Sequence, residues 1–352
     1  MTAHRPDYRI TRPGALIAAL PAVLGFVPEK SLVLVSLEKG EMGAVMRVDL
    51  SLALAGEVGH LAEIAGSSGV DTVVAVIVDA DGALCPICND DYRELCGELT
   101  AVLREHGVAL DAAHVVDRIE VGASWRCVDG CGATGTVDDP GASPLAAAAV
   151  LDGRRLYRTR EELKAVIAVT DPGRGDSLLV SIRERAAVRE AEWREDPDGC
   201  GRREVEAAIA AAGRVCGGAA LDDEEAAMLA CALTDVAVRD TLYALAVGSG
   251  AGQAETLWAW LARVLPDPWR AEALVLLAFS AYARGDGPLA GISLEAALRS
   301  DPEHRMASML DIALQAGMRP EQIRELASTG YRLAKRLGVR LPPRRAFGRR
   351  AV

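Results

Sequence analysis

Strand-type apolar runs occur in the first half of this sequence and disappear from Asp176 onward, and this change constrains the fold more than any other feature. Ser31–Leu37 (SLVLVSL) and Thr72–Val78 (TVVAVIV) are continuous and β-branched, as expected of strands buried on both faces. Helical spacing of apolar residues follows them, over Ala53–Ala65 and Asp90–His106. The alternation predicts an N-terminal α/β domain, a mixed sheet with flanking helices.

Weaker patterns complete this predicted domain. Thr159 and Glu162 form a capping box, the usual start of a helix. The remaining segments are two strands, a Gly-rich loop or short hairpin, and two short helices: Gly43–Leu50, Ala112–Val121, Gly122–Gly141, Ser143–Leu151 and Glu161–Ala168.

The second half of the chain predicts helices throughout. Their connections are short and contain Gly, Pro and Asp, as in stacked antiparallel helix pairs. With the boundary at Thr170–Asp176 (TDPGRGD), we expect an α/β domain (1–170), a helical domain (176–338) and a basic, mobile tail (339–352). After an arginine-rich first helix, the helices are expected at Arg203–Cys216, Asp222–Ala246, Ala251–Val264, Pro268–Ala283, Pro288–Arg299, Glu303–Ala316 and Pro320–Leu337.

One part of the helical half has the character of a repeat. Ala271–Pro302 places small residues where helices must approach closely, turns at Arg284–Gly287 and ends in Asp301-Pro302. This pattern resembles a tetratricopeptide unit. We therefore expect an all-α, tetratricopeptide-like C-terminal domain, whose concave surface would suit binding to a protein partner.

Composition narrows the class of protein. The chain has 352 residues, enough for two or three domains. Its net charge of −11 argues against a dedicated nucleic-acid coat. The N-terminus, MTAHRPDYRI, lacks an apolar signal segment, and apolar stretches such as Leu145–Leu151 and Ala271–Ala283 fall short of the roughly 20 residues that span a bilayer. We expect a cytoplasmic protein, in which thiols stay reduced.

Four of the eight cysteines form two close pairs. Cys85-Pro86-Ile87-Cys88 follows the strand Thr72–Val78, and Cys127 and Cys131 lie in the Gly-rich segment. Two close pairs on separate turns suit a tetrahedral zinc site, and four thiolates would make that site closed and structural. The alternatives are four small apolar residues, or a redox dithiol. Against the redox alternative, Cys85 has no clear strand-to-helix turn with a second redox partner nearby.

Two aspartates follow the same strand. Asp79 and Asp81 stand in the string VIVDADGAL, which is similar to the first motif of haloacid-dehalogenase phosphatases. That resemblance implies a nucleophilic Asp79 and an acid/base Asp81. The downstream Lys and paired acids of such enzymes have no clear counterpart, since Lys164 stands alone. The alternative is a polar strand-to-loop turn, where Asp and Gly are common.

The C-terminal 22 residues are strongly basic. They contain no Asp or Glu, and the rest of the chain carries −11 − 8 = −19. Attraction to nucleic acid or to an acidic partner is one interpretation, and a solvated tail that neutralises the acidic body is the other. The cations are Arg332, Lys335, Arg336, Arg340, Arg344, Arg345, Arg349 and Arg350.

Several strings together resemble an actinobacterial family, domain of unknown function 4192. The string Leu24-Gly25-Phe26-x-Pro28 and the turn at Gly285–Gly287 are the more specific of them. The resemblance covers most of the chain and implies the domain layout, but no reaction. The strings are Ala19–Leu34, Met46–Leu50, Ser124–Pro140, Ala237–Asp240 and Ala278–Pro302.

No nucleotide-binding or hydrolase motif of recognised form is present. The leading interpretation is therefore a protein-interaction or scaffold module, with a structural zinc at Cys85, Cys88, Cys127 and Cys131. The first alternative is a hydrolase or phosphotransferase that uses acidic residues of the α/β domain. The second is a nucleic-acid-associated regulator that binds through the basic tail.

Overall fold

The computed structural model describes residues 12–345, apart from 39–40, 52–53, 68–69 and 152–153. The chain divides into two compact units, and the second begins at Lys164. In the first unit the strands are β1 (Ser31–Glu38), β2 (Glu41–Asp49), β3 (Thr72–Val78), β4 (Ala109–Val116), β5 (Ser124–Cys127) and β6 (Thr134–Thr136). Its helices are α1 (Pro13–Leu24), α2 (Leu54–Ser67), α3 (Pro86–Glu105), the short 3-10 helix Pro140–Ala142, α4 (Pro144–Leu151) and α5 (Arg160–Lys164).

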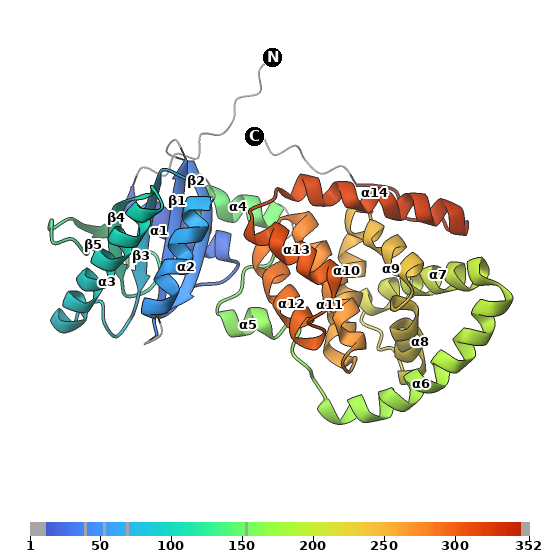
Figure 1. Ribbon diagram of the computed structural model, residues 1–352. Helices are drawn as coiled ribbons and strands as arrows, with labels where there is room; N and C mark the ends of the chain where they lie inside the picture. The colour runs from blue at the N-terminus through green and yellow to red at the C-terminus, as the bar shows by residue number, and fades with distance from the viewer. Residues whose placement is uncertain (1–11, 39–40, 52–53, 68–69, 152–153, 346–352) are drawn as a thin grey trace, which may run out of the picture. The chain divides into compact units, whose positions relative to one another are not determined.

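The strands form one mixed sheet in the order β2-β1-β3-β4-β5-β6 (Figure 1). Strands β3 and β4 are parallel and are connected through α3, whereas every other neighbouring pair is antiparallel. The mixed sheet with helices around it confirms the predicted α/β class of the first unit. The Gly-rich segment forms the β5–β6 hairpin, and β4 ends at Val116, five residues before the predicted end of that strand.

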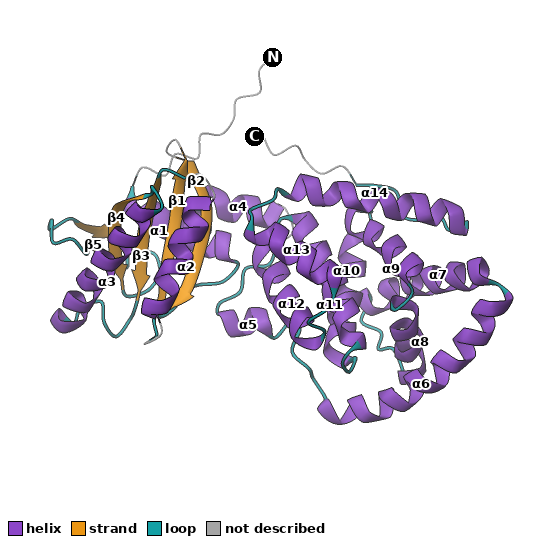
Figure 2. Cartoon of the chain, viewed as in Figure 1, coloured by secondary structure: helices purple, strands orange, loops and turns teal. Residues whose placement is uncertain are grey.

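Helices α2 and α3 cover one face of the sheet (Figure 2). Side chains from alternate positions of the central strands, Ile77 and Val115 among them, pack there against Leu99 and Leu103 of α3. The other alternate set is buried too, since Val33 and Val76 have no exposed surface. Burial on both faces explains why the central strands are continuous apolar runs instead of alternating ones.

Helix α1 was not predicted from the sequence. It is apolar around its whole circumference, so it lacks the one-sided pattern that marks a surface helix. Its ends nevertheless follow ordinary rules, because Pro13 occupies the first turn and Gly25 closes the helix with φ +75°. Gly14 lies where a Cβ would overlap the backbone carbonyl of Thr136, so this helix approaches β6 closely.

The second unit is helical, and its described residues contain no strand longer than an isolated bridge. The predicted helix Asp222–Ala246 is broken, because the Asp235 side chain accepts hydrogen bonds from two backbone N–H groups and starts a new helix. The helices are α6 (Pro172–Glu195), α7 (Pro197–Cys216), α8 (Asp223–Leu233), α9 (Val236–Leu242), the 3-10 helix Tyr243–Val247, α10 (Ala251–Val264), α11 (Trp269–Arg284), α12 (Gly287–Ser300), α13 (Arg305–Gln315) and α14 (Pro320–Leu337).

The turn between α11 and α12 contains the string Gly285–Gly287. Gly285 adopts φ +86°, which favours glycine. The Asp286 carboxylate is buried, accepts a hydrogen bond from the Leu289 N–H group at 3.2 Å, and lies 3.2 Å from the Arg284 guanidinium. This string therefore has a structural role, since it ends one helix and caps the next.

The described part of the predicted tail belongs to the fold. The N–H group of Ser249 donates to the carbonyl of Pro343 at 2.8 Å, and the N–H group of Arg345 donates to that of Val247 at 2.9 Å. The Arg344 guanidinium lies 4.8 Å from the centre of the Tyr331 ring. Residues 343 and 345 thus pair with Ser249 and Val247, and a mobile tail over 339–352 stays a prediction. Residues 346–352 lie outside the described residues, and attraction to nucleic acid or to an acidic partner stays a prediction.

Candidate thiol site

The first cysteine pair lies where β3 leads into α3. The N–H group of Asp79 donates to the carbonyl of Val116, so the parallel pairing of β3 and β4 ends at this turn. Cys85 is the N-cap residue of α3, Pro86 occupies its first turn, and Cys88 follows within that turn. Cys85 therefore lies at a strand-to-helix turn. The sequence had not made this turn clear.

The two thiols of this pair differ in the direction of their pKa shifts. The backbone N–H group and the thiol of Cys88 lower the pKa of Cys85 below the ordinary value for cysteine. The pKa of Cys88 is raised, first because its thiol donates to Cys85 and then because of burial and nearby negative charge. Both side chains are partly exposed and both thiols are free. Cys85 is therefore the better nucleophile of the pair at neutral pH.

The aspartates of the same turn are already engaged. The Tyr92 hydroxyl donates to Oδ2 of Asp79 at 2.6 Å, and the backbone N–H group of Asp81 donates to Oδ1 at 3.1 Å. The exposed carboxylate of Asp81 forms an ion pair with Lys30 at 2.7 Å. Burial and the Asp79 acceptor raise the pKa of Tyr92. The two carboxylates lie in the turn directly after β3, and their role in a hydrolase stays a prediction.

Two large apolar side chains on either side of Cys85 point to solvent. Leu84 is 87% exposed and Ile87 is 74% exposed. Leucine and isoleucine are among the residues most often buried, so two such side chains beside a nucleophilic thiol form an apolar rim. We call Leu84 and Ile87 the apolar rim below.

Cys127, the first residue of the second cysteine pair, points to the other face of the sheet. In the β4–β5 register Val115 is opposite Arg126, and His114 is opposite Cys127. Arg126 extends over the face covered by α3, because its guanidinium donates to the carbonyl of Ala83 and to Asn89 Oδ1. Neighbouring residues of a strand point to opposite faces, so Cys127 points away from α3.

In this structure the two cysteine pairs do not gather in one group, and a zinc site formed by all four thiolates stays a prediction. Among the described residues, the potential metal ligands that gather in a group of three are Cys127, Asp129 and Cys131, without Cys85 or Cys88. Zinc binding by all four thiolates would require the pairs to meet across the sheet. The sequence showed that each pair is close, but it did not show on which face of the sheet each pair lies.

Two of the strings that carry the family resemblance, Ala19–Leu34 and Met46–Leu50, meet in space. The guanidinium of Arg47 donates to the buried Ser31 hydroxyl at 2.8 Å and lies 5.9 Å from the centre of the Phe26 ring. It also pairs with Asp49, which is 3.7 Å from Arg160. This cluster joins the start of β1 to the end of β2, and the Arg47 side chain within it is only 11% exposed. We therefore assign the cluster a structural role.

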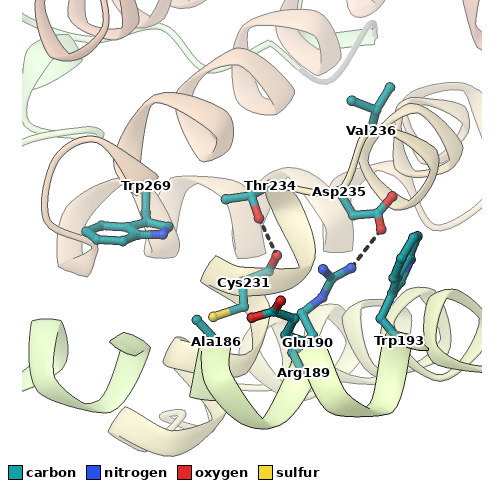
Figure 3. Close-up of a pocket in the computed structure, with 9 residues that line it drawn as sticks. All are labelled: Ala186, Arg189, Glu190, Trp193, Cys231, Thr234, Asp235, Val236 and Trp269. Atoms are coloured by element: carbon teal, nitrogen blue, oxygen red, sulfur yellow. Dashed lines mark hydrogen bonds and ion pairs between the residues drawn. The ribbon is translucent and has the colours of Figure 1, made fainter. Parts of the chain in front are cut away.

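The second unit contains a pocket of about 450 Å³ between α6, α8, α9 and the start of α11 (Figure 3). Its floor is polar, because the Arg189 guanidinium pairs with Asp235 at 2.7 Å. Trp193 and Val236 line it and are 46% and 58% exposed, and Trp269 lines it from the opposite side.

The comparisons with known proteins identify a family. A family model described as a domain of unknown function, DUF4192, matches residues 13–321. The chain belongs to the DUF4192 family. The suspected resemblance is thereby confirmed, and the match extends across both units of this DUF4192 protein. No curated protein matches the chain, and no solved structure does. Among the described residues, no helix is long and apolar enough to cross a membrane.

Proposed function

We propose that the α/β unit of this DUF4192 protein performs thiol–disulfide exchange at Cys85 and Cys88. The observation that carries the proposal is the position of both cysteines on the first turn of α3, with Cys85 at the N-cap. Helix N-termini favour negative charge and so favour the thiolate form. The difference in pKa between the two thiols adds support, since it distinguishes an attacking thiol from a resolving one.

The exchange requires no group beyond the two thiols and a substrate disulfide. The Cys85 thiolate attacks one sulfur of the substrate, the substrate S–S bond breaks, and one substrate thiolate leaves. The Cys88 thiol loses its proton to water and attacks the Cys85 sulfur, which releases the second substrate thiolate. The substrate gains two electrons, Cys85 and Cys88 become a disulfide, and an external dithiol such as dithiothreitol returns them to the reduced state.

The apolar rim suits a polypeptide substrate better than a small charged disulfide. Leu84 and Ile87 leave large apolar surfaces beside the attacking sulfur, and covering them with apolar side chains of a substrate would be favourable. We therefore propose protein or peptide disulfides with apolar neighbours as the substrate class.

The test is to react the reduced full-length protein with a disulfide-linked peptide whose cysteines have apolar neighbours. The wild-type protein is expected to form an internal Cys85–Cys88 disulfide, detected by mass spectrometry of its peptides. Cys88→Ser should accumulate a mixed disulfide on Cys85, and Cys85→Ser should form none. Cys216→Ser, which removes an exposed cysteine of α7, is the control and should behave as wild type. A mixed disulfide on Cys88 in place of Cys85 would contradict the proposal.

A second function is favoured by the pocket in the helical unit. We propose that this unit has tetratricopeptide-like stacking and binds a protein partner that inserts an apolar side chain beside Trp193. The support is the pairing of α11 with α12, which follow one another through a capped turn, and the exposure of Trp193 and Val236 in one pocket.

This second proposal is tested by comparing two variants of the same helix. Trp193→Ala removes the largest exposed ring of the pocket, whereas Val180→Ala removes an exposed side chain of α6 outside it. A partner captured by the wild-type protein and identified by mass spectrometry is expected to be retained by Val180→Ala and lost by Trp193→Ala. Retention by both variants would place the binding surface elsewhere.

A further inference from the structure

The turn of the β5–β6 hairpin gathers three potential metal ligands. The ligand atoms of Cys127, Asp129 and Cys131 all lie within 4.8 Å of one another. Gly130, between Asp129 and Cys131, and Gly132, directly after Cys131, have φ values of +79° and +80°, which favour glycine and turn the chain back on itself. A sulfur, a carboxylate oxygen and a second sulfur thus face one small volume.

A buried histidine lies beside this group on the neighbouring strand, although its ring nitrogens are not among the ligand atoms that gather within 4.8 Å. His114 is directly opposite Cys127, and the pair lies between the hydrogen-bonded pairs of the β4–β5 ladder, where side chains approach most closely. The residue is 94% buried, and its Nδ1 has no hydrogen-bond partner among the described residues. A buried nitrogen without a partner is costly. The ring of Trp125, 4.9 Å away, packs edge-on against the imidazole.

We propose that Cys127, Asp129, Cys131 and His114 together bind a zinc ion. Two thiolates, an imidazole nitrogen and a carboxylate are the donors that zinc takes in tetrahedral sites. Softer and harder metals fit this set less well, because it mixes sulfur with nitrogen and oxygen. The ion would use the one buried nitrogen of this group that has no partner.

Such a site would be structural. All four positions of the metal would be taken by protein ligands, which leaves none for water or substrate. The ion would join the end of the β5–β6 hairpin to the middle of β4. This site does not depend on the proposed exchange reaction, because Cys85 and Cys88 are on the α3 side of the sheet and take no part in it.

The test is zinc content of the full-length protein, purified reduced, with cobalt(II) substitution to report the ligands. The wild-type protein is expected to bind one zinc per chain, and its cobalt form should show the absorption bands of tetrahedral thiolate coordination. The double variant Cys85→Ser/Cys88→Ser should retain zinc with unchanged affinity. Cys131→Ser, Asp129→Asn and His114→Gln should each weaken binding by at least about tenfold, since even the loss of an outer partner of a ligand costs that much.

Other results would overturn the proposal. Loss of zinc from the Cys85→Ser/Cys88→Ser variant would indicate that the metal is bound by all four cysteines. Absence of bound zinc in the reduced wild-type protein, or a Cys127–Cys131 disulfide that forms as readily in excess zinc as without it, would exclude a metal site. If His114→Gln does not fold, the cobalt spectrum of Cys131→Ser decides, because loss of one thiolate must reduce the sulfur-to-metal absorption.

Discussion

At the residue scale, the turn after β3 depends on a glycine. A Cβ on Gly82 would overlap the Tyr92 hydroxyl and would lie 2.7 Å from Oδ2 of Asp79. Tyr92 is buried and donates its hydrogen bond to that same oxygen. The turn that positions Cys85 can therefore form in this way only if residue 82 lacks a side chain.

Gly82→Ala is accordingly expected to destabilise the protein by about 1–3 kcal/mol, because it overfills a packed site and displaces Tyr92. The measurement is chemical denaturation. Gly97→Ala is the matched control, because Gly97 is in α3 with nothing within 4 Å of its added Cβ, and replacing a helical glycine there should stabilise by roughly 1 kcal/mol. Equal effects of the two substitutions would contradict this account.

The reactivity of Cys85 should depend on pH in a defined direction. Because the pKa of Cys85 is lowered by the N–H group and thiol of Cys88, its thiolate persists to lower pH than an ordinary cysteine. Alkylation by iodoacetamide, followed peptide by peptide, is expected to modify Cys85 faster than Cys88 at neutral pH. The rate should fall as pH drops through the lowered pKa.

The matched variant for this measurement is Cys88→Ala, which removes the thiol donor but keeps the backbone N–H group. Its Cys85 profile should move to higher pH. A profile that stays in place would mean that the neighbouring thiol does not influence Cys85.

At the element scale, one ion cluster connects the first helices of the second unit. The Arg189 guanidinium of α6 donates to both carboxylate oxygens of Glu204 in α7, at 2.6 and 3.0 Å. It also binds the carboxylate of Asp235, which caps α9. Glu204 is only 4% exposed, and both of its carboxylate oxygens accept hydrogen bonds from Arg189.

Arg189→Ala is expected to destabilise the helical unit by about 3–5 kcal/mol, because it leaves a buried carboxylate without a partner. Denaturant unfolding measures the change. The double variant Arg189→Met/Glu204→Leu removes both charges of the Arg189–Glu204 pair and leaves Asp235 with its two backbone N–H donors, so it should recover most of the loss. A double variant as unstable as Arg189→Ala would indicate that lost packing, and not the unpaired charge, is responsible.

At the scale of the whole molecule, the chain consists of two compact units that divide between Leu163 and Lys164. Each has its own fully buried side chains, Leu99 of α3 in the first and Leu257 of α10 in the second. Units with separate cores are able to unfold separately.

Calorimetry of the full-length protein is expected to show two transitions. Leu99→Ala should lower the temperature of one transition and Leu257→Ala that of the other, each at a cost of about 2–5 kcal/mol to its own unit. A single transition that both substitutions shift equally would mean that the units unfold together.

The elements that local patterns mark were predicted well. Strand β3 and helices α10 and α14 occupy the predicted residues, because their signals depend on spacing and on capping residues within a few positions. Helix α1 was missed because burial on all sides removes the one-sided pattern. The division of Asp222–Ala246 was missed because Asp235 caps a helix within a continuous apolar pattern.

By itself the sequence determined most of the strands and helices, the family, and the closeness of each cysteine pair. Only the tertiary structure decided that Cys85 caps α3, that Cys127 is on the opposite face, and that His114 is its neighbour. The reason is physical. Capping and periodicity act over a few residues, whereas the face that a strand residue occupies depends on its register with a strand elsewhere in the chain, and a shift of one residue would reverse it.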